Sequence, residues 1–209
     1  MSIISRLASS LNRRDEAPNQ ELAAQILAAD DKEAIKELIE GLSNKNKDIQ
    51  SDCIKVLYEI AEARPQLLAG YADEFIALLD SKNNRLQWGA MTALDAITHQ
   101  NPEVIYKSLA RIISAADKGS VITNDHCIGI LIKLASHKEF EGDAISLLLE
   151  RLISAPANQL PMYAERSLPV ITQKNKAAFG RILASRLPDI EKESKLSRVE
   201  KVLKRLQSK

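Results

Sequence analysis

Aromatic residues are scarce in this chain: Phe, Trp and Tyr make up 4% of its 209 residues. Because β-strands are enriched in aromatic and β-branched side chains, this scarcity disfavours a β-sheet protein. Seven glycines and seven prolines also leave little room for the many tight turns of a β-sandwich. Alanine, leucine and isoleucine are abundant instead, so the composition predicts an all-α protein.

Reactive and metal-binding residues are also few. Two cysteines, Cys53 and Cys127, provide neither a disulfide framework nor the paired spacing of a zinc site. The three histidines, His99, His126 and His137, share no i, i+4 spacing that would converge on a metal. The sequence contains no glycine-rich phosphate loop and no nucleophile elbow. It therefore predicts no cofactor, no metal site and no enzymatic activity.

Long apolar runs are absent as well. None approaches the roughly 18 residues of a membrane-spanning helix, so we expect no membrane span. The lack of a disulfide framework predicts a cytoplasmic location. The first residues, MSIISRLASSLNRR, lack the continuous apolar core of a secretory signal. They place Ile3, Ile4, Leu7 and Leu11 on one helical face, which predicts a short amphipathic helix that caps the fold. A transit peptide and a membrane-surface helix are the alternatives.

The net charge of +1 conceals an uneven distribution. Residues 174–209 hold 11 Lys and Arg against 4 Asp and Glu, a local charge of +7. The rest of the chain holds 18 against 24, a charge of −6. A basic tail on an acidic body indicates either an acidic partner, nucleic acid included, or a solvated C-terminal helix.

Internal self-similarity is the strongest signal in the sequence. The stretch ELIEGLSNKNKDIQSDCIKVLYEIAEARP, from Glu37, aligns without a gap with EFIALLDSKNNRLQWGAMTALDAITHQNP, from Glu74. The same offset of 37 residues continues, with decreasing fidelity, through the chain. We expect a single domain over residues 1–209: N-terminal helices in 1–36, four repeats at 37–73, 74–110, 111–147 and 148–184, and a basic capping helix in 185–209.

Each repeat shows the pattern of two helices joined by a polar turn. In the second repeat, the second helix carries one apolar stripe of period 3.6, formed by Leu86, Ala90, Ala93, Leu94 and Ile97. A single pair of helices cannot bury such a stripe, whereas stacked pairs bury it against their neighbours.

The stretch LLDSKNNRLQWGAMTALDAI, residues 78–97, resembles the second half of a HEAT repeat, of the HEAT and armadillo superfamily. The shared features are a Leu-Leu-Asp helix exit, a short polar turn and a Leu-x3-Ala-x3-Leu-x2-Ile helix. The resemblance implies a right-handed α-solenoid of stacked antiparallel helix pairs. The chain departs from it where many HEAT repeats have a basic residue, since that position holds Gln50, Gln87, Asn124 and Pro161.

The repeat register predicts a structural role for both cysteines. Cys53, Ala90, Cys127 and Ala164 occupy one position of the second helix, where a small side chain lets neighbouring helices approach closely. In the fourth repeat, Pro161 fits the first turn of that helix, whereas Pro169 is expected to kink or end it. A last amphipathic helix is expected over residues 191–207.

The only tryptophan lies away from the apolar stripe. On a helical wheel, Trp88 points about 200° from Leu86, beside Thr92 and Asp95. The resemblance places this side of the second helix on the concave surface, where solenoids bind partners. The corresponding positions of the first and fourth repeats complete the predicted binding surface with Lys55, Tyr58, Met162 and Arg166. The alternative is that Trp88 is covered by the N-terminal helix or packs sideways on the next repeat.

These observations predict a non-enzymatic helical-repeat scaffold that binds a protein partner through its concave face. The alternative is a nucleic-acid-binding protein, because a group of alkylpurine DNA glycosylases is built from HEAT-like repeats. That resemblance implies concave aromatics and a carboxylate, which Trp88, Asp95 and Arg166 would supply. A nucleic-acid binder usually has a basic binding face, whereas here the excess of basic residues lies in the tail.

Overall fold

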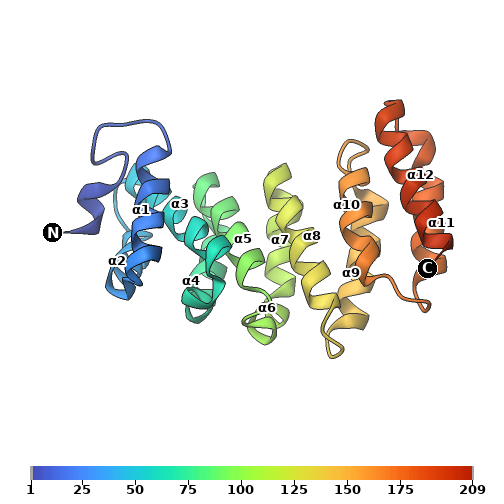
Figure 1. The fold of residues 1–209 in the computed structure, drawn as a ribbon, viewed down its shortest axis with the longest axis horizontal. Coiled ribbons are helices and arrows are strands. Elements are labelled where there is room, and N and C mark those ends of the chain that lie inside the picture. The colour runs from blue at the N-terminus through green and yellow to red at the C-terminus, as the bar shows by residue number, and fades with distance from the viewer. Residues whose placement is uncertain (1, 209) are drawn as a thin grey trace. The chain divides into compact units, whose positions relative to one another are not determined.

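The computed structural model describes residues 2–208, all of whose regular elements are helical (Figure 1). No helix within those residues is both long and apolar enough to cross a membrane. The helices are α1 (Ala17–Ala29), α2 (Lys32–Gly41), α3 (Lys47–Ala63), α4 (Ala72–Ala77), α5 (Asn84–Ile97), α6 (Pro102–Lys107), α7 (Leu109–Lys118), α8 (Val121–Ala135), α9 (Glu141–Ser154), α10 (Leu160–Ser167), α11 (Lys176–Arg186) and α12 (Glu193–Gln207).

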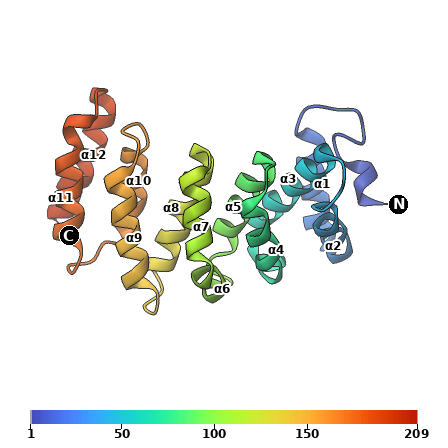
Figure 2. The same cartoon turned by 180° about the vertical axis from the view of Figure 1, so that it is seen from behind.

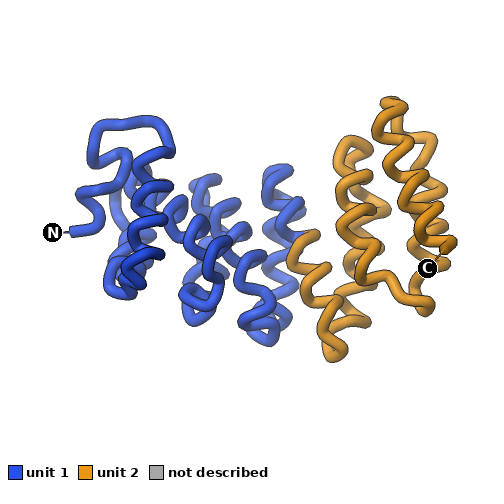
Figure 3. The backbone as a smooth tube through the Cα atoms, in the orientation of Figure 1, with its two compact units in different colours: residues 1–127 blue, residues 128–209 orange. Residues whose placement is uncertain are grey.

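The chain divides into two compact units, Met1–Cys127 and Ile128–Lys209 (Figure 3). The first unit holds the successive pairs α2–α3 and α4–α5, then α7 and the first turns of α8 (Figure 1 and Figure 2). The second unit holds the pairs α9–α10 and α11–α12. The helical pairs confirm the predicted α-solenoid class, whereas the division into residues 1–36, 37–184 and 185–209 stays a prediction.

Short helices that the two-helix pattern did not predict follow the second helix of the first repeats. They are η2 (Pro65–Leu67), η3 (Ala69–Tyr71) and α6, and Pro65 and Pro102 stand at the start of η2 and α6. Proline has no amide hydrogen and a fixed φ, so it ends the preceding helix and opens a new turn. The repeats of the first unit therefore carry a third, short helix after each proline.

The shared small-residue position lies in the core, as predicted. Cys53, Ala90, Cys127 and Ala164 are all fully buried. Around them, Leu57 of α3 and Leu94 of α5 are also fully buried, so the apolar stripe of each second helix faces its neighbours. The cysteines are packing residues of the repeat.

The position that departs from the HEAT pattern has a structural use. The side-chain amide of Gln87 donates a hydrogen bond to the Leu79 carbonyl (2.9 Å), and that of Asn124 donates to the Ala116 carbonyl (2.9 Å). The last carbonyl groups of a helix lack intrahelical partners, so these two amides satisfy the end of one helix from the start of the next. Gln50 donates instead to the Asn44 carbonyl, in the turn after α2 (2.7 Å).

Both proline predictions in the second unit are confirmed. Pro161 lies in the first turn of α10, and α10 ends at Ser167, followed by the 3₁₀ turn η5 (Leu168–Val170) that contains Pro169. The last helix, α12, begins two residues after its predicted start and ends at the predicted residue, Gln207.

The N-terminal segment differs from its prediction. It forms the 3₁₀ turn η1 (Ile3–Arg6) in place of an amphipathic helix. Leu11, which was predicted to lie on the apolar face of that helix, is 51% exposed. Helix nucleation is costly in so short a segment, and tertiary hydrogen bonds replace the helical ones. The Ala8 amide donates to Asn19 Oδ1 (3.0 Å) and the Ser9 amide to Asp52 Oδ2 (2.7 Å).

Two glycines provide a matched test of helix packing. A Cβ atom on Gly89 would lie 2.6 Å from Cγ1 of the buried Ile54, whereas one on Gly142, in the first turn of α9, would meet nothing within 4 Å. Gly89→Ala is therefore expected to destabilise the fold by about 1–3 kcal/mol through overpacking. Gly142→Ala is expected to stabilise it by about 0.5–1 kcal/mol through helix propensity. Urea unfolding measures both, and equal effects would contradict the close approach of α3 and α5.

The cysteine packing predicts inert thiols in the native protein. Burial, together with the charges of Asp52 and Glu37, raises the pKa of the Cys53 thiol to about 12, so its reactive thiolate is almost absent at pH 8. We expect Ellman's reagent to label neither Cys53 nor Cys127 before unfolding, and to label both in urea. Rapid labelling of either thiol in the native state would contradict this packing.

Candidate functional site

The packing of α3 against α5 brings the predicted aromatic residues together. The rings of Tyr58 and Trp88 are tilted by 51° with centroids 5.5 Å apart, a favourable geometry for an aromatic pair. Tyr58 is buried, whereas Trp88 remains partly exposed. We name Lys55, Tyr58 and Trp88 the aromatic ridge.

Lys55 supports the ridge from within. It is only 6% exposed, and its Nζ forms ion pairs with Glu59 (2.6 Å) and Glu16 (2.9 Å) while lying 4.8 Å from the centre of the Tyr58 ring. Burial works to lower the pKa of Lys55, but hydrogen bonds with Glu59, Tyr58 and Glu16 outweigh it and raise that pKa above its ordinary value. Lys55 is therefore a fixed cation that holds the Tyr58 ring in place.

Glu16, at the start of α1, connects the N-terminal segment to the ridge. Its carboxylate binds Lys55 and also reaches Arg85 of α5 (3.4 Å). One predicted alternative was that the N-terminal helix covers Trp88. In the structure, the Glu16 carboxylate from this region pairs with Lys55 and Arg85. Trp88 contacts the Tyr58 ring, and part of its own surface remains exposed.

Thr92 and Asp95 lie on the same side of α5 as Trp88, but neither is open to solvent. They are 4% and 7% exposed, which corrects the expectation that this side of the helix faces outward along its whole length. Thr92 Oγ1 donates to the Trp88 carbonyl (2.9 Å), and Asp95 hydrogen-bonds His126 Nδ1 of α8 (2.9 Å). A helical wheel shows only which side of a helix a residue occupies, and tertiary contacts such as the one with His126 bury that side here.

Met162 and Arg166 belong to the second unit. They lie four residues apart on α10, Met162 partly exposed and Arg166 exposed. Their participation in binding stays a prediction.

Carboxylates gather around the ridge. Glu59 and Glu62 follow Tyr58 on α3, and Glu16 and Asp95 approach from α1 and α5. Burial, together with the negative charges of Glu59 and Asp95, raises the pKa of Glu62. An aromatic surface beside clustered carboxylates is suited to a cationic ligand. Among residues 2–208, no three His, Cys, Asp or Glu side chains are placed to hold a metal ion.

Sequence reasoning missed Glu16, Glu59 and Arg85. The role of Glu59 could have been predicted from the sequence, because Glu59 follows Lys55 by four residues and an i, i+4 ion pair is expected on a helix. Glu16 and Arg85 are separated by 69 residues, and no local pattern joins them.

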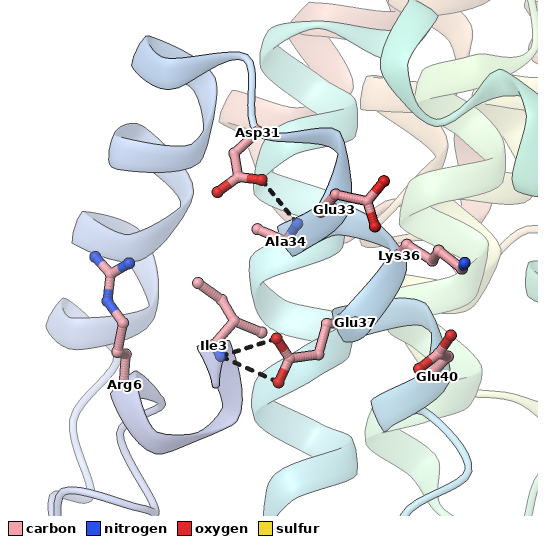
Figure 4. Close-up of a pocket in the computed structure, with 8 residues that line it drawn as sticks. All are labelled: Ile3, Arg6, Asp31, Glu33, Ala34, Lys36, Glu37 and Glu40. Atoms are coloured by element: carbon pink, nitrogen blue, oxygen red, sulfur yellow. Dashed lines mark hydrogen bonds between the residues drawn. The ribbon is translucent and has the colours of Figure 1, made fainter. Parts of the chain in front are cut away.

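Two polar cavities adjoin the N-terminal segment. The first, about 350 Å³, lies between η1 and α2, where both carboxylate oxygens of Glu37 accept from the Ile3 amide (3.1 and 3.0 Å; Figure 4). Hydrogen bonds from the Ser2 hydroxyl and the Ile3 amide lower the pKa of Glu37, so this carboxylate anchors the chain end. The second, about 740 Å³, is lined in part by Glu16 and Arg85, which form an ion pair with each other.

The partial burial of Trp88 predicts an intermediate energetic role. Trp88→Ala is expected to cost about 1–2 kcal/mol, between the effect of an ordinary surface site and the roughly 3–5 kcal/mol of a buried Trp. Leu94→Ala, at a fully buried position of the same helix, is the control and is expected to cost about 2–5 kcal/mol. Urea unfolding of both variants measures the two losses of unfolding free energy. A Trp88 effect as large as that of Leu94 would make the ring a core residue.

Comparisons with known proteins give the fold. No family model matches the chain, and no curated protein does. A crystal structure of an engineered protein covers 100% of this chain and 98% of its own, with a TM-score of 0.65 and 18% identity. A designed armadillo repeat protein in complex with the peptide (KR)4 covers 88% of this chain and 85% of its own, with a TM-score of 0.66 and 17% identity.

A second designed armadillo repeat protein covers 98% of both chains, with a TM-score of 0.63 and 17% identity. Identities this low show the fold alone. The predicted resemblance to HEAT and armadillo repeats is confirmed at that level, and the chain has an armadillo/HEAT-like helical-repeat fold.

Proposed function

We propose that the protein is a non-enzymatic repeat scaffold whose aromatic ridge binds a Lys- and Arg-containing segment of a protein partner. The observation that carries the proposal is the partly exposed Trp88, in contact with the buried Tyr58, whose neighbour Lys55 pairs with Glu16 and Glu59. Trp, Tyr and Arg dominate the binding energy of protein interfaces.

The ridge is held in place before any partner arrives. Tyr58 is buried and Lys55 is fixed by two ion pairs, so the side chains beneath Trp88 lose little conformational entropy on binding. A rigid aromatic surface with one exposed ring can bind the aliphatic part of a Lys side chain or the guanidinium group of an Arg side chain.

The charge of the first unit favours a basic segment. Residues 1–127 hold 14 Lys and Arg against 19 Asp and Glu, a formal charge of −5. Near the ridge, Glu59 and Glu62 follow Tyr58 by one and four residues on α3, and Glu59 pairs with Lys55. The similarity to a designed armadillo repeat protein that was solved with the peptide (KR)4 supports the same choice.

The glycosylase alternative receives less support from this site. Asp95, its candidate carboxylate, is buried and hydrogen-bonded to His126. The acidic charge of the first unit also opposes the approach of a phosphate backbone. Cys53 and Cys127 are buried and form no disulfide, which fits a reducing compartment, and we propose the cytoplasm.

Because Trp88 is the only tryptophan, its fluorescence reports occupation of the ridge directly. We expect titration with an alternating Lys-Arg peptide to change the emission of Trp88, and an Asp-Glu peptide of equal length to leave it unchanged. With a labelled peptide, Trp88→Ala should weaken binding about tenfold or more, the loss typical of an interface hot spot.

Tyr71→Ala is the matched control, because Tyr71 precedes α4 and is not part of the ridge. It should leave the affinity unchanged. Binding of the basic peptide that survives Trp88→Ala would move the site away from the ridge, and preference for the acidic peptide would refute the proposed partner chemistry.

A further inference from the structure

The second unit carries the opposite charge. Residues 128–209 hold 15 Lys and Arg against 9 Asp and Glu, a formal charge of +6. Much of this excess comes from α12, which packs against α10 and α11 (Figure 1). The proposal above does not use this surface.

The packing of α12 sorts its side chains onto distinct sides. Val199, Val202 and Leu206 are buried in the unit. On the side toward α10, Lys195 Nζ donates to Asn158 Oδ1 (2.7 Å), and Arg198 binds both carboxylate oxygens of Glu165 (2.9 and 2.5 Å). These two cations are engaged within the protein.

Three further cations follow Arg198 along α12. Lys201, Lys204 and Arg205 are exposed, and none forms an ion pair with another residue in the range 2–208. Their spacing of three and four residues places them along one side of the helix, together with the hydroxyl of Ser208. We name Lys201, Lys204 and Arg205 the basic face.

Two carboxylates lie near the basic face: Glu200, exposed and four residues before Lys204 on α12, and Glu165 of α10. Neither forms an ion pair with Lys201, Lys204 or Arg205 within residues 2–208. The pKa of Glu165 is lowered first by its hydrogen bond to Arg198 and further by the positive charges of Arg205 and Lys201. Since Arg198 already binds both oxygens of Glu165, the charges of the basic face remain available to an external anion.

The positions of the exposed apolar side chains limit the kind of partner that the basic face can bind. Exposed large apolar side chains occur at Leu11, Val121, Ile122 and Ile153, and none of these lies on α12. A protein interface needs an apolar or aromatic anchor, which the basic face lacks. A membrane-surface helix must insert its apolar side into lipid, but the apolar side of α12 is buried in the unit. With these two kinds of partner excluded, the basic face is left with a partner that it binds through charge alone.

We propose that the basic face of α12 binds the phosphate backbone of nucleic acid without sequence specificity. Lysine, arginine and hydroxyl groups are the side chains that commonly contact phosphates. Three phosphate contacts release condensed counterions, so the affinity must fall with salt along a log–log slope near −3, about −0.9 per contact. Non-specific affinities of this kind correspond to a Kd of about 10⁻⁴–10⁻⁶ M.

Fluorescence anisotropy of a short labelled DNA duplex, between about 50 and 200 mM salt, tests the proposal on the full chain. The variant Lys201→Gln, Lys204→Gln, Arg205→Gln should lower the affinity about tenfold or more and reduce the salt slope by about one for each charge removed. The matched control, Lys32→Gln, Lys36→Gln, Lys45→Gln, removes three exposed charges from the first unit and should leave both quantities nearly unchanged.

Each alternative has its own outcome. No binding of duplex by the wild type at low salt would overturn the proposal, and so would an equal loss of affinity in both triple variants, because net charge alone would then explain it. Polyglutamate that displaces the duplex at equal charge concentration would identify an acidic protein as the partner. Co-flotation with phosphatidylserine vesicles that the basic-face variant loses, without duplex binding, would identify a membrane.

Discussion

The close approach of α3 and α5 is the contact on which the first unit depends. It requires a glycine at position 89, where any Cβ would collide with Ile54. Interiors are packed to crystal-like density, so this approach sets the separation of the two helices. Tyr58 follows Ile54 by four residues on the same side of α3, and its ring contacts Trp88, the neighbour of Gly89.

A second constraint comes from buried polar groups. Asn19 Nδ2 donates to Asp52 Oδ1 (2.7 Å), while the other oxygen of Asp52 accepts from the Ser9 amide. A buried carboxylate is costly unless its oxygens are hydrogen-bonded, so these partners must stay together. They tie the N-terminal segment and α1 to α3, and this fixed position brings Glu16 to Lys55. The hydrogen bonds of Asp52 therefore hold the N-terminal segment on the fold and also fix the position of Glu16 in the candidate site.

The two units present different chemistry to their surroundings. The first is acidic and offers one open aromatic ring; the second is basic and offers cations on a helix whose apolar side is buried. Aromatic anchors stabilise contacts with protein, whereas a cationic surface without anchors is suited to a polyanion. The opposite charges of the two units therefore suit different classes of ligand.

The sequence by itself determined the helical class, the repeat, the buried small-residue position, the proline-broken end of α10 and the extent of α12. Each follows from local periodicity or from the covalent geometry of proline, which act over a few turns of helix. It also placed Tyr58 and Trp88 on corresponding sides of successive helices. Only the tertiary structure decided that Thr92 and Asp95 are covered, that Glu16 and Arg85 meet, and that residues 3–11 form a turn in place of a helix. Those outcomes depend on contacts between residues far apart in the chain, whose energies exceed the local helical preference and leave no periodic trace in the sequence.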